Sequence, residues 1–379
     1  MGPLHGIKVV EFEGLGPGPL CGMILADMGA EVTVIERPAR SAMQAKLGGE
    51  GGGNLLNRGK RAVAINLKQP AGVDLALQLV DRADALIEGN RPGVMERLGL
   101  GPETCHARNA RLVYGRMTGW GQSGPLAQAA GHDLNYVALS GVMPRTQRSG
   151  GVPMVPTTLV GDAPAGLALA FGIVCAVLEA RASGRGQVVD SAIVDTTAYL
   201  GSLLHWFAAA GQLAPDAPRL LQGDAPFYEV YACADDKHIS LGPLEPQFFR
   251  LFLEKLELTD VDPELQYDTA GWPALKARIA ERVRQRPRDA WCRLLEGSDV
   301  CFAPVLDFDE AAAHPHHVAR QTYARVDGVL QAAPAPRFSR TPGAAPSVAR
   351  ALPTADAIFA ALGVDAQTLA ELRATGTVG

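Results

Sequence analysis

Three polar residues in this chain stand where their types and surroundings could support proton transfer. His132 lies in the stretch 131–136 (Gly-His-Asp-Leu-Asn-Tyr), Asp162 opens a helical pattern, and Glu245 precedes another. A histidine can act as base or acid because its reference pKa is about 6.5, whereas an aspartate needs a pKa raised by burial or by another carboxylate. Each residue also has a structural alternative. His132, which stands beside Asp133, could cap a helix, and so could Asp162. Glu245 could simply interact with the positive N-terminal end of a helix.

A glycine-rich turn follows the first strand pattern and is similar to a dinucleotide-binding fingerprint. Gly14 and Gly16 have the expected spacing, and the acidic Glu36 lies about 20 residues further on. The third glycine of the fingerprint would fall at position 19, where this chain has Pro19. Prolines in the turn also remove amide donors that would face a pyrophosphate. The turn is interpreted as a tight strand-to-helix connection, and a nicotinamide-dependent dehydrogenase is kept as an alternative.

The elements that would position these residues alternate between strands and helices over about the first 120 residues. Strands separated by helix-length segments indicate βαβ units and a Rossmann-like, mostly parallel sheet. Ligands of such a sheet bind beyond the carboxyl ends of its strands. The predicted strands are 7–12, 31–36, 61–66, 85–88 and 112–117, and the predicted helices are 19–28 and 72–83.

The pattern changes after the alternating region. Two long helical patterns run from 164 to about 213, with a break near 183–186. From Phe227 onward, a hairpin pattern and several short helices predict a smaller α+β domain, whereas the Pro/Ala-rich stretch 333–353 is expected to be extended on the surface. The predicted α/β architecture is therefore a large domain (1–200, with a C-terminal return 325–379), a linker (201–225) and a small domain (226–324).

Composition excludes several classes of protein. With 47% hydrophobic and 20% charged residues, the chain is expected to fold, and a net charge of −5 argues against nucleic-acid binding. Six scattered cysteines without a C-x-x-C pair predict neither a zinc site nor a disulfide framework, and the histidines within 314–317 are expected to lie in a surface loop. No signal peptide is expected at the N-terminus, and the apolar run 163–178 is expected to be a buried helix. These features predict a cytoplasmic protein without a membrane segment or a bound metal.

Several separated motifs, found in order from about residue 4 to about residue 340, resemble the family III CoA-transferase superfamily. Within it the chain is most similar to the α-methylacyl-CoA racemase branch. The resemblance implies the family III CoA-transferase fold and an acyl-CoA substrate. The motifs are 9–11, 26–29, 88–93, 119–125 with 131–136, 159–162 and 242–247.

The resemblance also implies roles for particular residues. His132 and Asp162 match the catalytic residues of the racemases, and Glu245 matches a glutamate that supports the histidine. The family forms interlocked homodimers, with each active site between the large domain of one subunit and the small domain of its partner. No cofactor is implied besides the CoA of the substrate. The matching CoA-binding positions are Arg37, Ile65, Asn66, Leu67, Lys68, Gly89, Asn90, Arg91, Arg97, Gly131, Asp133, Leu134, Asn135 and Tyr136.

The implied reaction is epimerisation of 2-methylacyl-CoA thioesters by 1,1-proton transfer through an enolate. One base removes the proton on the α-carbon and a conjugate acid on the opposite face returns one, while amides at the helix start near Asp162 are expected to stabilise the enolate oxygen. The alternative is a family III CoA-transferase, in which Asp162 attacks a thioester and His132 is not needed. A non-catalytic CoA-binding protein is a further alternative. The sequence Ala163-Pro164-Ala165 departs from a glycine-rich turn common in the family, which leaves the acyl preference open.

Overall fold

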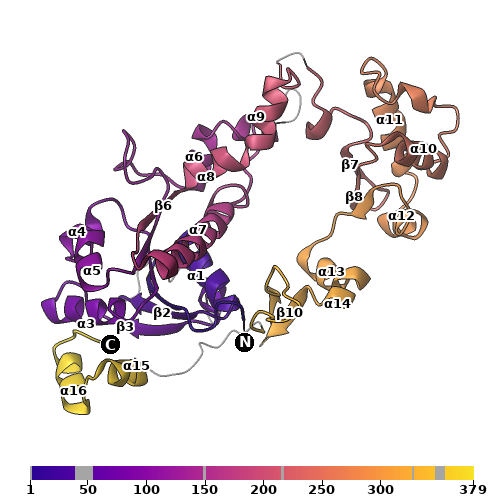
Figure 1. Ribbon diagram of the computed structural model, residues 1–379. Helices are drawn as coiled ribbons and strands as arrows, with labels where there is room; N and C mark the ends of the chain where they lie inside the picture. The colour runs from indigo at the N-terminus through magenta and orange to yellow at the C-terminus, as the bar shows by residue number, and fades with distance from the viewer. Residues whose placement is uncertain (1, 39–53, 148–150, 215–216, 327, 346–354) are drawn as a thin grey trace. The chain divides into compact units, whose positions relative to one another are not determined.

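The computed structural model describes residues 2–38, 54–147, 151–214, 217–326, 328–345 and 355–379 (Figure 1). Its contacts divide the chain into two compact units. Unit 1 comprises 1–140, 156–199 and 315–379, and unit 2 comprises 141–155 and 200–314. These limits differ from the predicted domains because 141–155 and the expected linker group with unit 2, and 315–324 groups with unit 1. Part of the predicted extended stretch, 346–354, lies outside the described residues.

Unit 1 is built on a six-stranded parallel sheet with the order β3-β2-β1-β4-β5-β6. The order reverses between β1 and β4, so the loops after these two strands diverge at the carboxyl edge of the sheet, where α/β sheets bind ligands. Strand β6 was not predicted, because the sequence pattern there was taken as a continuation of helices. The strands are β1 (Lys8–Phe12), β2 (Glu31–Glu36), β3 (Arg61–Ala64), β4 (Ala85–Glu88), β5 (Val113–Thr118) and β6 (Val188–Ala192).

Helices cover both faces of this sheet (Figure 1). Alternate residues of a strand point to opposite faces, so Val9 of β1 packs with α1 and α7, whereas Val10 packs with α3, α15 and α16. This two-sided burial explains why the strands read as nearly continuous apolar runs. The helices of unit 1, of which α14 is not part of this packing, are α1 (Pro17–Asp27), α3 (Pro70–Val80), α4 (Val94–Arg97), α5 (Pro102–Arg108), α6 (Asp133–Leu139), α7 (Asp162–Ser183), α8 (Ile193–Leu200), α14 (Pro315–Arg320), α15 (Ala355–Leu362) and α16 (Ala366–Ala374).

Helix α7 is the apolar run expected to be buried. Its length and hydropathy would also suit a membrane span, but it packs in unit 1 against α1, β5 and β6. The two helices approach closely at Gly166, where a Cβ would come within 2.8 Å of the Pro17 carbonyl oxygen. Leu167, Phe171 and Leu178 on α7 remain exposed. The close approach brings the start of α7 against the turn that precedes α1.

A buried ion pair fixes that turn to the sheet. Lys60 Nζ donates to both carboxylate oxygens of Glu11, at 2.9 and 2.6 Å, and to the Pro19 carbonyl at 2.8 Å. Both side chains are 1% exposed. A Cβ at Gly22 would lie 1.8 Å from Glu11 Oε2, so only glycine fits there. Burial raises the pKa of Glu11 to about 7, against the opposing effect of Lys60.

Unit 2 has a small antiparallel sheet, β7-β8-β9, with a core formed by its strands and the helices α10 to α12. The predicted hairpin and the predicted short helices are present, whereas the third strand was not predicted. The elements are β7 (Glu229–Ala232), β8 (His238–Leu241), β9 (Phe302–Pro304), α9 (Ser202–Ala209), α10 (Pro246–Lys255), α11 (Trp272–Val283), α12 (Arg288–Leu295) and α13 (Phe308–Ala313). In unit 1, β10 (Tyr323–Val326) and β11 (Val329–Ala332) form a further hairpin that was not predicted.

Candidate active site

His132 and Asp162 lie at the starts of two helices in unit 1. His132 has an extended backbone immediately before α6, and its N–H donates to Asn135 Oδ1 at 3.0 Å. Asp162 is the first residue of α7, and its N–H donates to Asp133 Oδ1 at 2.7 Å. Asp133 thus joins the two helix starts, because it belongs to one and accepts from the other. His132 is exposed and its charge acts on the Asp162 carboxylate.

The pKa of the Asp162 carboxyl lies closer to neutral pH than that of an ordinary aspartate. Its pKa is raised from 3.8 to about 6, mainly by burial and further by the negative charge of Asp133, while His132 opposes the rise. A base is most effective when its pKa lies near the working pH. Asp133 approaches closely because residue 161 is glycine: a Cβ at Gly161 would come 2.2 Å from Asp133 Oδ1.

Gly16, part of the turn that is similar to a dinucleotide fingerprint, faces this carboxylate. Its φ is +67°, which glycine adopts without strain, and a Cβ there would lie 2.9 Å from Asp162 Oδ2. The space next to Gly16 is therefore occupied by the Asp162 carboxylate. Sequence reasoning identified the tight turn but not its partner, because the contact depends on how α1 and α7 pack.

The amides expected to stabilise an enolate at the start of α7 are already engaged. The Asp162 N–H donates to Asp133, and the Ala163 N–H donates to the Thr158 carbonyl at 3.0 Å. Pro164 has no N–H, and the Ala165 N–H donates to the Gly161 carbonyl. That expectation is therefore wrong for these amides.

Two cavities in unit 1 contain most of the predicted CoA-binding residues. The first, of about 570 Å³, lies over β1 to β3 at the carboxyl edge of the sheet. The Arg37 N–H is held there by Glu13 Oε2 at 3.1 Å. Arg37 and Lys68 give this cavity two cationic side chains, which suit phosphate groups. Its predicted lining residues are Arg37, Ile65, Asn66, Leu67, Lys68 and Asn90.

The second cavity, of about 420 Å³, contains His132. Asn90 lines both cavities. Tyr136 donates to the Gly131 carbonyl and packs edge-on against Trp120, with ring centroids 4.7 Å apart. Burial, then the Asp162 charge, raises the pKa of Tyr136, so its hydroxyl stays protonated and can donate. The other predicted residues here are Gly89, Arg91 and Asn135.

Three predicted CoA-binding residues do not line either cavity. Asp133 bonds to the Asp162 amide, Leu134 is exposed on α6, and Arg97 lies on α4 close to Gly93. Asp133 therefore supports Asp162, the predicted catalytic aspartate, in the structure. Its role was missed because the motif around His132 does not show which element it contacts.

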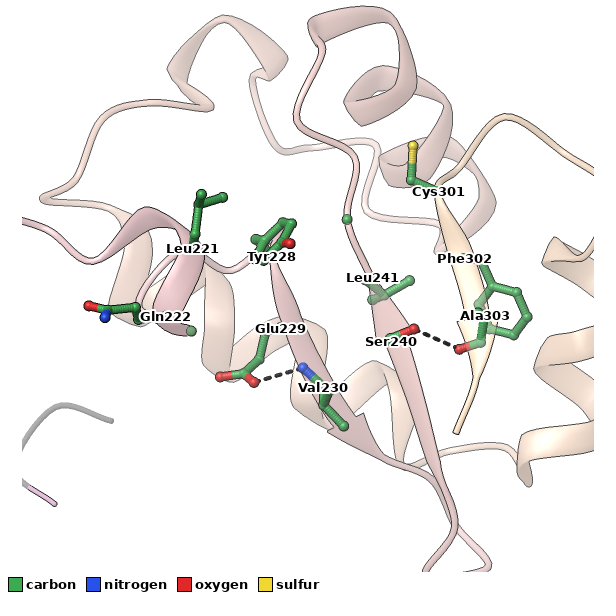
Figure 2. A pocket seen from close by; sticks show the side chains of 12 residues that line it. Leu221, Gln222, Tyr228, Glu229, Val230, Ser240, Leu241, Cys301, Phe302 and Ala303 are labelled. Atoms are coloured by element: carbon green, nitrogen blue, oxygen red, sulfur yellow. Dashed lines mark hydrogen bonds between the residues drawn. The ribbon is translucent and has the colours of Figure 1, made fainter. Parts of the chain in front are cut away.

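Glu245 lies in unit 2, exposed immediately before α10. A nearby cavity of about 510 Å³, unsuspected from the sequence, is shown in Figure 2. Its side chains come from β7, β8 and β9 and the turn Leu220–Gln222. Ser240 Oγ donates to the Ala303 carbonyl at 3.0 Å across two strands. The Gly242 N–H donates to the Cys301 carbonyl at 2.9 Å, which ties the segment leading to Glu245 to this wall.

Among the described residues, no group of three His, Cys, Asp or Glu side chains could hold a metal ion. All six cysteines are free thiols.

A family model, CoA-transferase family III, matches residues 4–357. The chain belongs to CoA-transferase family III. This membership and the parallel sheet confirm the predicted fold class. A crystal structure of a CAIB/BAIF family protein from Brucella suis has a TM-score of 0.82 at 25% identity, covering 95% of this chain and 99% of that one.

Curated relatives distinguish between activities within the family. The α-methylacyl-CoA racemases of Mus musculus and Homo sapiens are 43% and 40% identical over 351 residues, covering 92% of this chain and 89% of each relative. An acetyl-CoA:oxalate CoA-transferase of Acetobacter aceti is 31% identical, covering 87% of each chain. The higher similarity to the racemases supports an enzyme of the racemase type over a CoA-transferase.

Proposed function

We propose that the protein epimerises 2-methylacyl-CoA thioesters, with one of Asp162 and His132 removing the proton on the α-carbon and the other returning a proton to the opposite face. The observation that carries this proposal is that Asp133 links the two helix starts carrying these residues, with the pKa of Asp162 raised to about 6. That value lets Asp162 serve as base or acid near neutral pH, and an imidazole side chain can take either role in proton transfer.

The proton transfer balances in both directions. In one, the Asp162 carboxylate takes the α-proton and an imidazolium at His132 returns one to the opposite face. In the other, neutral His132 takes the proton and a protonated Asp162 returns one. Each well-placed acid or base contributes roughly 10²- to 10⁴-fold to the rate. The positive end of α7 lowers the energy of the enolate between the two steps.

The acyl-CoA substrate is proposed to occupy the two cavities of unit 1. Cationic Arg37 and Lys68 in the first, and Arg91 in the second, suit the phosphates of CoA, because arginine can pair with phosphate through two donors. Deprotonation next to a thioester needs no electron carrier. We therefore propose that CoA within the substrate is the only coenzyme. We also propose that the enzyme needs no metal and that it works in the cytoplasm.

The active enzyme is proposed to be an interlocked homodimer in which Glu245 of the partner subunit supports His132. Large apolar side chains remain exposed in each unit: Leu167 and Phe171 in unit 1, and Leu203 and Trp206 in unit 2. Exposed apolar groups of this size are typical of protein interfaces. Sedimentation is expected to show a dimer at assay concentrations. A fully active monomer would contradict this part of the proposal.

Hydrogen exchange tests the chemistry directly. One epimer of a 2-methylacyl-CoA is incubated with the protein in D₂O, and deuterium at the α-carbon and the epimer ratio are followed over time. We expect exchange and convergence of the two epimers, unaffected by a chelator and without added nicotinamide. His132→Ala and Asp162→Ala should each prevent epimerisation. Transfer of CoA to a free acid, with full retention of the α-hydrogen, would instead show a CoA-transferase.

A further inference from the structure

A buried charge network lies near the carboxyl ends of the neighbouring strands β4 and β5. Glu88 and Arg116 are register partners on these strands and are 0% and 6% exposed. Arg116 Nε donates to Glu88 Oε1 at 2.9 Å. Its Nη1 and Nη2 atoms donate to the two carboxylate oxygens of Glu96, at 2.9 and 3.3 Å. One guanidinium thus joins the end of a strand to a carboxylate on α4.

The same network holds the chain between these two carboxylates. Glu88 Oε2 accepts the Asn90 N–H at 2.7 Å, which fixes the turn that leaves β4. The Asn90 side chain donates to Met95 Sδ at 3.3 Å, and Met95 is fully buried. Segment 89–97 is therefore attached at its beginning through Glu88 and near its end through Glu96.

The conformation of segment 89–97 depends on such attachments. Helix α4 within it has only four residues, and helices this short are unstable without tertiary contacts. Gly93 has a φ of +82°. Glycine adopts this conformation as readily as others, so Gly93 does not by itself fix the path of the segment. The segment also forms walls of both cavities in unit 1: Asn90, Val94 and Met95 line the first, and 89–92 lines the second.

Arg116 is not placed to bind a ligand phosphate itself. Its Nε, Nη1 and Nη2 atoms all donate to carboxylates, and its guanidinium lies 5.6 Å from the centre of the Tyr114 ring. One positive charge faces two negative ones. Without it, two carboxylates beside the cavities would repel a polyanionic ligand, and the Glu96 end of segment 89–97 would lose its attachment to β5.

We propose that Arg116, together with Glu88 and Glu96, is a positioning residue that holds segment 89–97 in the conformation that binds CoA. This inference rests on the proposed CoA-binding function of the two cavities. It assigns the network to ligand affinity and leaves proton transfer to His132 and Asp162, which lie on other elements.

The test compares Glu96→Ala with Glu103→Ala. Glu96 is only partly buried, so its removal detaches α4 without opening the core. Glu103 is an exposed glutamate on the neighbouring α5 and serves as the matched control. Free CoA is titrated by calorimetry, and kcat and KM are measured with a 2-methylacyl-CoA. We expect the Kd for CoA and the KM to rise about tenfold in Glu96→Ala, the usual scale for losing one charge-assisted hydrogen-bonded pair, with kcat within about twofold.

Arg116→Lys supplies a second test if Glu96→Ala fails to fold. Lysine keeps the positive charge but not the planar fork that engages both carboxylates, so the Kd for CoA should again rise while kcat is retained. CoA affinity within about twofold of the wild type in a folded variant, or a loss of kcat at unchanged affinity, would overturn the inference. If the wild type itself binds no CoA, the proposed function fails, and this inference with it.

Discussion

Replacing Asp162 by asparagine should make the protein more stable at neutral pH while abolishing its activity. The native site disfavours the ionised carboxyl, since its pKa is raised from 3.8 to about 6. Each pKa unit is worth about 1.4 kcal/mol, so the rise corresponds to about 3 kcal/mol against the ionised native state. Asp162 is partly exposed, and solvent screening reduces this to about 1.5 kcal/mol. Asparagine has nearly the same shape and no charge, and its backbone N–H can still donate to Asp133.

The sign of the pH dependence follows from proton binding. Between about pH 4 and pH 6 the native state holds a proton on Asp162 that the unfolded chain has lost. The wild type therefore gains stability as the pH falls through this window, whereas Asp162→Asn does not. The advantage of the variant should be full above about pH 7 and should disappear near pH 4.

Urea denaturation at a fixed protomer concentration measures this difference at several pH values. Asp299→Asn makes the same chemical change at an exposed position and should alter the free energy of unfolding by less than about 0.5 kcal/mol. An Asp162→Asn variant that is less stable than the wild type at about pH 7.5, or an advantage that does not shrink toward acid, would refute the argument.

Two further predictions concern the surroundings of this carboxyl, and a third concerns the buried Glu11–Lys60 pair. Asp133→Asn removes the second cause of the raised pKa, so the acidic limb of the pH profile of kcat/KM should move below about pH 6; an unmoved limb would contradict this. Gly16→Ala places a methyl group against Asp162 Oδ2, so kcat should fall about 100-fold with little change in CoA affinity, and an unchanged kcat would show that the carboxyl does not occupy this position. Lys60→Met leaves Glu11 buried without its partner and should cost about 3–5 kcal/mol in urea denaturation. Adding Glu11→Leu should restore most of that loss, and an equally unstable double variant would argue against the pair.

Much of the large sheet could be predicted from the sequence, because two-sided burial produces apolar runs that are visible without a structure. Strand β6 was missed for a physical reason. It is an edge strand in which Asp190 and Ser191 interrupt the apolar residues, and it follows α7 after a short break. Strand β9 has only three residues, too few to show an alternation. Its place is set by pairing with β8, which is distant in the chain.

The candidate site was predictable only in part. His132 and Asp162 stand in short motifs that carry their own signal, whereas the parts played by Gly16 and Asp133 arise from contacts between segments far apart in the chain. The engaged amides at the start of α7 could not be foreseen either, because the partner of the Ala163 N–H is set by the turn at Thr158, whose φ is +63°. Motifs indicate which groups are present, and packing decides which of their atoms remain available.

The buried Glu11–Lys60 pair, next to the turn that precedes α1, also constrains how this sequence can evolve. Glu11, Lys60 and Gly22 occupy one tightly filled space, since a Cβ at Gly22 would collide with the carboxylate. A mutation of Glu11 or Lys60 alone leaves the other charge buried without a counter-charge. Replacing the pair by two apolar residues avoids a buried charge, but it requires both codons to change. Lineages that lose the pair must therefore pass through a destabilised intermediate. Glu11, Lys60 and Gly22 should accordingly be inherited, or replaced, as a set.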